Sequence, residues 1–114
     1  MLIRFCNIDY DREMAIMAEY TSDGKRRSVG VGRLIVMPGS ETAELAILVA
    51  DDFQNNGLGL KLLDILIGIA QEKGLKSIYA TVLPGNNKMM GLARKLGMTI
   101  ERLSPEESKV TLAL

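Results

Sequence analysis

The segment Gln54–Gly59 most constrains the fold of this chain, because it joins two apolar runs of different kinds. The run before it, Ala43 to Ala50, has the length and composition of a buried strand, and Leu58 to Ala70 has the length of a helix. Gly57 and Gly59 let the backbone of such a turn approach a ligand closely. Since the helix N-terminus adds about half a positive charge, the turn predicts an anion site suited to a phosphate or pyrophosphate.

Three phosphate-binding turns compete for this segment. A P-loop requires a Lys directly after a glycine, whereas Lys61 follows no glycine and no Ser or Thr comes after it. A dinucleotide fingerprint requires a third glycine where this chain has Leu62. The pattern Q/R-x-x-G-x-G/A fits at all its fixed positions, Gln54, Gly57 and Gly59. The alternative to a phosphate-binding turn is a glycine-containing turn that connects the strand to a core helix and binds no ligand.

The segments that follow the turn have a characteristic order. A β-branched and aromatic run, Ser77–Leu83, comes after the long helix and is broken by Pro84–Asn86. Asn86 can cap a short helix that ends near Leu96. This order, together with the turn, resembles the GNAT family of N-acetyltransferases, although Met98 stands where the family usually has Phe.

Two further segments resemble one subgroup of that family. Ile8–Ala15 is similar to the entry to the acetyltransferase domain of bacterial Pat-type protein-lysine acetyltransferases, and Thr42–Ala46 also matches that subgroup. The resemblance runs from about Ile8 to Met98. It implies an acetyl-CoA-dependent N-acetyltransferase acting on an amine, with a protein lysine as the favoured acceptor. A non-catalytic acyl-CoA-binding or regulatory module and an acetyltransferase for a small amine are the alternatives.

Composition narrows the function independently of any motif. The chain has 114 residues, 47% of them apolar, which is enough for the core of one small domain. Its formal net charge of zero gives no indication of a nucleic-acid-binding surface. No apolar run reaches the length of a membrane span, and no signal peptide is visible. The single Cys6 excludes an internal disulfide and fits a reducing compartment, so we expect a cytoplasmic protein.

The absence of histidine excludes several kinds of chemistry. It removes Ser-His-Asp hydrolysis, Cys-His catalysis and His-containing zinc sites. One cysteine cannot build a Cys-rich metal site, and no dense carboxylate cluster is spaced for a metal ion. Asp51 and Asp52 are interpreted as a polar strand end. We therefore expect no metal cofactor.

The chain predicts a single domain over residues 1–114 with a mixed sheet and helices packed on its faces, an α/β (α+β) layer architecture. The resemblance implies a GNAT-like, mostly antiparallel sheet with two main helices. The expected strands cover Met14–Tyr20, Ser28–Met37, Glu41–Ala50, Ser77–Leu83, Met98–Leu103 and Ser108–Leu114, and the expected helices cover Leu58–Lys73 and Asn86–Leu96.

The family pattern normally places a strand and two helices ahead of the segment found here, so the chain is expected to lack them. Those helices usually form one wall of the acceptor site. We expect Met14–Tyr20 to lie near an unprotected sheet edge, with apolar surface left uncovered. This predicts a homodimer or higher oligomer with Met1–Tyr20 at or near the contact. The alternative is that Leu2, Ile3 and Phe5 fold back and cover the gap within one chain.

The resemblance also implies which residues bind acetyl-CoA. The pyrophosphate would lie against the turn and the first helical residues, namely Gln54, Asn55, Asn56, Gly57, Leu58, Gly59, Leu60 and Lys61. The pantetheine amides would pair with the cofactor strand like an added strand, which points to Ile47, Leu48 and Val49. Asn86 matches the Asn that opens the family's second conserved helix, where it binds the pantetheine arm or caps the helix.

Transfer to an amine requires a base, because an ammonium ion has no lone pair. Glu44 lies in an otherwise apolar strand, and desolvation in a cleft would make its carboxylate a stronger base. The resemblance aligns the catalytic glutamate of Pat-type domains with Glu44; the alternative is a surface Glu at the sheet edge. Glu41 is a weaker candidate. The tyrosine that many relatives use as an acid aligns with Ala93, and Tyr79, on a strand, does not replace it.

Overall fold

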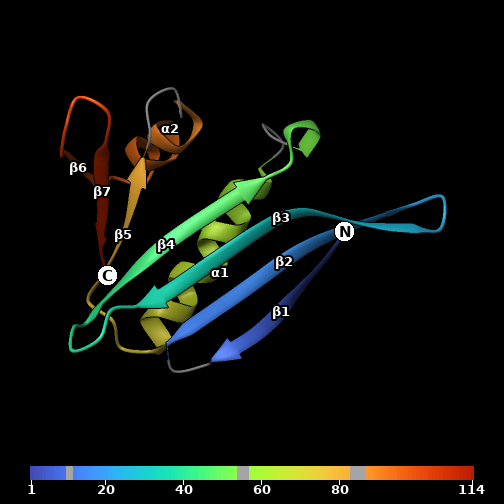
Figure 1. The fold of residues 1–114 in the computed structure, drawn as a ribbon, viewed down its shortest axis with the longest axis horizontal. Helices are drawn as coiled ribbons and strands as arrows, with labels where there is room; N and C mark the ends of the chain where they lie inside the picture. Colours follow the sequence, from blue (N-terminus) through green and yellow to red (C-terminus); the bar gives the residue numbers. More distant parts are fainter. Residues whose placement is uncertain (10–11, 54–56, 83–86) are drawn as a thin grey trace.

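The structure is a computed structural model that describes residues 1–9, 12–53, 57–82 and 87–114 (Figure 1). Within these ranges seven strands form one sheet in the order β1-β2-β3-β4-β5-β7-β6. Neighbouring strands are antiparallel except for β4 and β5, which are parallel. The strands are β1 (Leu2–Asp9), β2 (Glu13–Ser22), β3 (Lys25–Val36), β4 (Thr42–Val49), β5 (Ser77–Val82), β6 (Thr99–Arg102) and β7 (Ser108–Ala113).

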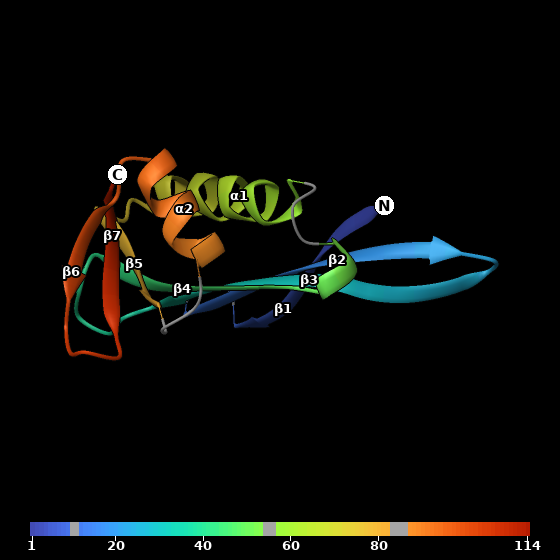
Figure 2. The ribbon, with the colours of Figure 1, turned by 90° about the horizontal axis from the view of Figure 1, so that it is seen from above.

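Two α-helices lie on one side of this sheet, as the edge-on view in Figure 2 shows. They are α1 (Leu58–Glu72) and α2 (Asn87–Lys95), and a short 3₁₀ helix, η1 (Asp51–Phe53), follows β4. The predicted α/β (α+β) class with a mostly antiparallel sheet is confirmed, and each expected element is present within a few residues of its predicted bounds. Neither described helix is long and apolar enough to cross a membrane.

The N-terminal segment forms a strand that the sequence did not predict. The expectation that Met14–Tyr20 lies at an unprotected sheet edge is wrong, because β1 pairs with β2 from Leu2 opposite Glu19 to Asp9 opposite Glu13. The physical reason is that an edge strand leaves its N–H and C=O groups without partners, and a neighbouring extended segment of the same chain supplies them. The alternative, in which Leu2, Ile3 and Phe5 cover the gap within one chain, holds only in part, because β1 pairs with β2 while Leu2 and Phe5 stay exposed.

Side chains reinforce this added strand. Arg4 Nε lies 2.6 Å from Glu19 Oε1 across the β1–β2 pair, and Glu19 is buried. Ile3 packs against the core, whereas Leu2 and Phe5 are 53% and 60% exposed. β1 is therefore attached to the domain but is itself the outermost strand, with apolar side chains in solvent.

β2 and β3 form a long hairpin whose tip projects beyond the rest of the sheet (Figure 2). Asp23 and Gly24 have φ values of 51° and 75°, which suit a tight two-residue turn between twisted strands. A register shift between Ala18 and Glu19 marks a bulge, and bulges increase the local twist. The residues from Thr21 to Ser28 are exposed, so the end of the hairpin stands in solvent.

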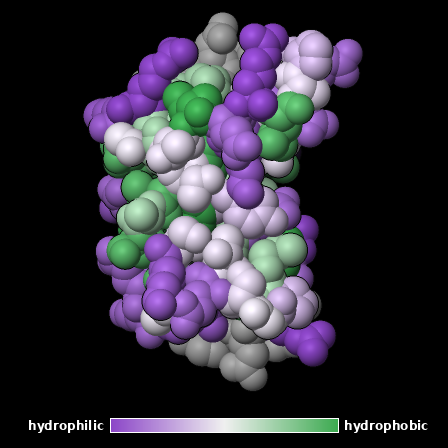
Figure 3. Space-filling model, turned by 90° about the vertical axis from the view of Figure 1, so that its left-hand side faces the viewer, coloured by the Kyte–Doolittle hydropathy of each residue, from purple (hydrophilic) through white to green (hydrophobic). Residues whose placement is uncertain are grey.

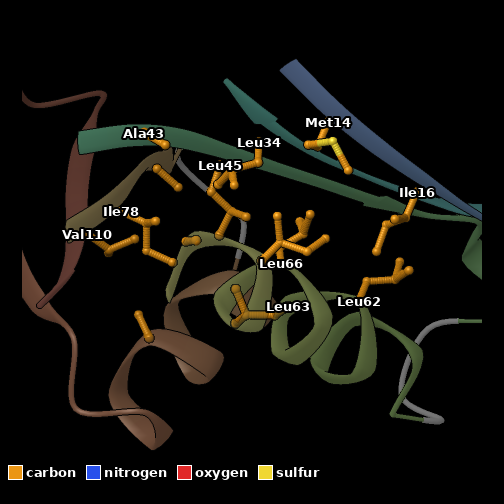
Figure 4. Close-up of a cluster of buried hydrophobic side chains, with 14 of the residues drawn as sticks. Met14, Ile16, Leu34, Ala43, Leu45, Leu62, Leu63, Leu66, Ile78 and Val110 are labelled. Carbon is orange, nitrogen blue, oxygen red and sulfur yellow. The ribbon is translucent and has the colours of Figure 1, made fainter. Parts of the chain in front are cut away.

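The core lies between α1 and strands β3, β4 and β5 (Figure 4). The buried residues of α1 recur at three- and four-residue spacings that form one helix face: Leu58, Leu62, Leu63, Leu66, Ile69 and Ala70. Gly32 of β3 permits this close packing, because an added Cβ there would lie 2.9 Å from Leu66 Cδ1. The sheet contributes Ile16, Leu34, Ala43, Leu45, Ile78 and Val110.

The two faces of the sheet differ in what covers them. Ala43 and Leu45 of β4 are buried toward the helices, whereas Ala46 and Leu48 are exposed, as expected for side chains that alternate along a strand. In the part of the chain that the structure describes, no helix covers the second face (Figure 2). We call this the open face; it carries Glu44, Ala46 and Leu48 together with the side chains paired with them in β3 and β5.

Replacing Leu66 by Ala tests the helix–sheet contact. Leu66 is fully buried over Gly32, so Leu66→Ala should lower the free energy of unfolding by about 2–5 kcal/mol, the cost of lost burial plus a cavity. Urea denaturation measures the change. Leu103→Ala is the matched control, because Leu103 is 50% exposed and its truncation should stay within about 0.5 kcal/mol. Equal effects of the two substitutions would contradict the assigned core.

Candidate functional site

The sheet opens between β4 and β5. Among the described residues their parallel ladder contains three pairs, of which Glu44 opposite Tyr79 is the last. Beyond this pair β4 continues beside β3 as far as Val49, while β5 continues beside β7 as far as Val82. Figure 1 shows β5 turning away from β4, with α2 above the opening. Within the described part of β5, the edge of β4 that faces it therefore has no ladder partner after Glu44.

The predicted pantetheine-binding residues lie on this stretch of β4. Ile47 and Val49 are half-buried and pack against the core, whereas Leu48 is 75% exposed on the open face. A shallow depression of about 250 Å³ lies between the start of β3 and the end of β4, lined by Ser28–Val31 and Leu48–Ala50. It lies on the β3 side of the strand, not at the β5 side to which the prediction applies. The predicted pantetheine binding would therefore use the backbone N–H and C=O groups of β4 on the side that faces β5.

The predicted pyrophosphate segment leads into α1. Gly57 is the N-cap residue, with φ 85°, and no side chain caps the helix. The first turn of α1 carries no acidic residue, so nothing in it offsets the positive end of the helix dipole. Leu58 is buried, Gly59 and Leu60 are half-buried, and Lys61 is exposed. Gln54, Asn55, Asn56 and Asn86 lie outside the described residues.

Three elements converge at the start of α1. A Cβ added to Gly59 would lie 3.8 Å from Leu92 of α2 and 3.9 Å from Val49 of β4. Among the residues that the structure describes, none outside its chain neighbours lies within 4 Å of a Cβ added to Gly57. The end of β4, the start of α1 and one side of α2 thus border one region, next to the opening between β4 and β5.

The 3₁₀ turn η1, which follows β4, contacts the β2–β3 hairpin through an ion pair and aromatic packing. Arg27 donates two hydrogen bonds to the carboxylate of Asp52, at 2.6 and 2.8 Å. The same guanidinium lies 5.8 Å from the ring centroid of Phe53, and that ring packs at 5.2 Å against Tyr20. The hydrogen bonds from Arg27 lower the pKa of Asp52 below its usual value. Asp52 is therefore an ion-pair partner and not merely a polar strand end, and Arg27, although exposed on the hairpin, is held by this ion pair.

Glu44 lies half-buried on the open face. The Tyr79 hydroxyl donates a hydrogen bond of 3.4 Å to Glu44 Oε2. Burial, together with the charge and hydrogen bond of Glu44, raises the pKa of Tyr79, so its hydroxyl stays protonated at neutral pH. Lys109 Nζ lies 4.6 Å from the centroid of the Tyr79 ring. Glu44 thus lies where β4 and β5 begin to separate, beside Tyr79. The sequence alone did not connect these two residues.

The other residues considered for the base and acid roles do not fit them. Glu41 is exposed and pairs with Lys76 at 3.0 Å, ahead of the β4–β5 ladder. Ala93, at the position where relatives carry a tyrosine, is fully buried in α2. No local sequence signal connects Tyr79 or Lys109 with Glu44, because the contact depends on the strand pairing.

Two relatives with curated names are similar in sequence. An acetyltransferase of Pseudomonas aeruginosa is 32% identical over 108 residues, which cover 95% of this chain and 58% of that protein. An L-methionine sulfoximine/L-methionine sulfone acetyltransferase of Pseudomonas paraeruginosa is 38% identical over 65 residues, covering 57% of this chain and 38% of that protein. The chain thus spans less than two thirds of the length of these relatives.

Solved structures share the fold. The GNAT domain of S. lividans PAT matches with a TM-score of 0.79 and 26% identity, over 96% of this chain and 65% of that one. A cAMP-binding acyltransferase from Mycobacterium smegmatis matches with a TM-score of 0.73 and 25% identity, over 90% of this chain and 31% of that one.

The family model described as the acetyltransferase (GNAT) family matches residues 2–98. This match covers the opening between β4 and β5, the start of α1 and most of the sheet. The resemblance seen in the turn at Gly57 and Gly59 is thereby confirmed, and the chain belongs to the acetyltransferase (GNAT) family.

Proposed function

We propose that this chain transfers an acetyl group from acetyl-CoA to an amine. The observation that carries the proposal is the position of Glu44, a half-buried carboxylate at the last β4–β5 pair. Beyond it, among the described residues, lies an edge of β4 without a β5 partner, and then the N-terminus of α1. A base, a strand edge and an anion site therefore follow one another along one opening.

The donor would bind along that opening. In this proposal the pantetheine amides pair with the backbone of Ile47–Val49 as an added strand. The pyrophosphate lies at the N-terminus of α1, where backbone N–H groups and the helix dipole favour an anion. Gly57 supports this, since no described residue beyond its chain neighbours lies within 4 Å of a Cβ added there. The same proposal includes the neighbouring residues Gln54, Asn55, Asn56, Leu58, Gly59, Leu60, Lys61 and Asn86.

Glu44 would act as the general base. It accepts a proton from the ammonium group of the acceptor, and the resulting amine attacks the thioester carbonyl carbon. The new C–N bond forms as the C–S bond breaks, and coenzyme A leaves as a thiolate that takes up a proton. A thiolate with a pKa near the ordinary cysteine value, about 8.5, is a tolerable leaving group without a dedicated acid.

A protein lysine is the acceptor that we favour. The similarity to the GNAT domain of S. lividans PAT supports it, and no described helix covers the open face, so a side chain on another polypeptide can reach Glu44. A small amine is the second candidate. It is favoured by the similarity to an enzyme named for the acetylation of L-methionine sulfoximine and L-methionine sulfone.

Glu44→Gln tests the catalytic role. It keeps the shape of the side chain and removes the base, so kcat should fall by roughly 10²–10⁴-fold, with little change in the Kd for acetyl-CoA. A coupled thiol-release assay with lysine peptides and small amines measures turnover. Glu41→Gln is the matched control, because Glu41 is exposed and pairs with Lys76 away from the opening. If kcat is the same in Glu44→Gln as in the parent protein, the mechanism is refuted. If the parent protein itself shows no turnover, the non-catalytic binding module is favoured.

Gly57→Glu tests the donor site. The new carboxylate would block the helix N-terminus and repel the pyrophosphate, so acetyl-CoA binding should be lost in calorimetry. Gly57 has φ 85°, so backbone strain must be separated from the charge effect. Gly39→Glu makes the same change at another glycine of positive φ, 70°, with no neighbour near its added Cβ. Unchanged affinity in Gly57→Glu would overturn the pyrophosphate assignment.

We also propose a homodimer or higher oligomer that uses the N-terminal segment Met1–Tyr20. The outer strand β1 exposes Leu2 and Phe5, and an outer strand invites pairing with another chain. At the opposite end of the sheet, Figure 3 shows hydrophobic side chains interspersed with hydrophilic ones, without a single continuous patch.

Sedimentation at micromolar concentration tests this assembly. The parent should sediment above the monomer mass, and the pair Leu2→Lys and Phe5→Lys should sediment as a monomer, because the charges repel across the contact. Ile100→Lys with Leu103→Lys, on and beside β6 at the other end of the sheet, should leave the assembly intact. A clean monomer mass for the parent would count decisively against the oligomer.

A further inference from the structure

Three side chains from three strands form a row on the open face. Glu44 comes from β4, Tyr79 from β5 and Lys109 from β7. Glu44 and Tyr79 are a ladder pair, and Lys109 pairs with Thr81, two residues further along β5. Because paired residues project from the same face of a sheet, the register alone brings the three side chains together.

The contacts within this row are directional. The Tyr79 hydroxyl donates to Glu44 Oε2 at 3.4 Å, and Lys109 Nζ lies 4.6 Å from the centroid of the Tyr79 ring. A cation this close to an aromatic face is attracted to it, which restrains the ring. The ring in turn sets the direction of its hydroxyl. Glu44 therefore has one oxygen engaged, while its Oε1 keeps its capacity to accept a proton.

We propose that Tyr79 is a positioning residue for Glu44. Its hydroxyl holds Oε2, so that Oε1 is turned toward the proton of the acceptor amine, and Lys109 keeps the ring in place. This inference rests on the proposed function of Glu44 as a base. The raised pKa of Tyr79 is consistent with it, because a protonated hydroxyl is a donor throughout the neutral range.

Other charged groups near Glu44 do not duplicate this contact. On β3, Ile35 is the residue opposite Glu44, and Arg33 lies two pairs further along, opposite Ala46. Arg33 forms an ion pair with Glu13 of β2, which is opposite Ile35. On the β5 side, the facing groups are Tyr79 and, across its ring, Lys109.

The split between kcat and KM tests the proposal. Tyr79→Phe keeps the ring and removes the hydroxyl, so kcat should fall about tenfold, the effect of one hydrogen bond to a charged group. KM for the acceptor and the Kd for acetyl-CoA should change little, because in this proposal Tyr79 orients the base and binds neither substrate.

A double substitution separates positioning from packing. In a Glu44→Gln background, Tyr79→Phe should not change the rate further, because the group that it positions is absent. Tyr20→Phe, on the hairpin, is the matched control and should leave the parent kcat unchanged. An equal loss of rate in both backgrounds, or a loss in Tyr79→Phe that appears in KM alone, would overturn the proposal.

A second measurement does not require turnover. Carbon NMR of isotope-labelled glutamate side chains follows the Glu44 carboxyl group, identified by the resonance lost in Glu44→Gln. In Tyr79→Phe the chemical shift of this resonance at neutral pH should differ from that of the parent, because a hydrogen bond to the carboxylate is lost, and in Tyr20→Phe it should not. An unchanged chemical shift refutes the contact with Tyr79. A changed chemical shift in a chain that acetylates no amine supports the contact and places the failure in the proposed function instead.

Discussion

The packing of α1 against β3 is the contact on which the rest of the structure depends. Leu62 and Leu66 are fully buried, and they approach the sheet where β3 has Gly30 and Gly32. Added Cβ atoms there would lie 3.1 Å from Leu62 and 2.9 Å from Leu66, so larger residues would push the helix outward. Because α1 begins next to Gly57, the same contact fixes where the helix N-terminus lies relative to the end of β4.

The opening between β4 and β5 follows from the partners that each strand has on its other side. β4 pairs with β3 up to Val49, and β5 pairs with β7 up to Val82. Each strand is therefore held in the sheet without the other, and the two can separate after Glu44 and Tyr79. A sheet with an internal edge can accept an extended ligand while its outer strands keep their own partners. Glu44, the proposed base, lies where the separation begins.

Periodic elements could be predicted from the sequence because local spacing encodes them. The apolar spacing of α1 and the glycine at its start were sufficient to place the helix and its open N-terminus. β1 was not predicted, since its polar and apolar residues give no clear alternation and its stability comes from pairing with β2. The contacts of Arg27 with Asp52 and of Tyr79 with Glu44 join residues 25 and 35 positions apart.

Such contacts depend on strand register, which no short motif specifies. The candidate base itself could be chosen from the sequence, because Glu44 interrupts an apolar strand. Its hydrogen-bond partner could not, because the end of the parallel ladder decides which residue of β5 lies beside it. The roles of Ile47, Leu48 and Val49 in cofactor binding stay predictions, and Gln54, Asn55, Asn56 and Asn86 lie outside the described residues.

The link between the β2–β3 hairpin and η1 has a consequence for how the domain responds to its medium. Arg27 and Asp52 are both more than half exposed, so dissolved ions screen their attraction. The contacts of Phe53 with Tyr20 are far less sensitive to such screening, because they are not ion pairs. In dilute buffer the hairpin and the turn that precedes α1 are joined by charge and by ring packing. At high ionic strength the hairpin and η1 are joined mainly by the packing of Tyr20 against Phe53. The end of the hairpin is then less restrained, while its strands stay paired in the sheet.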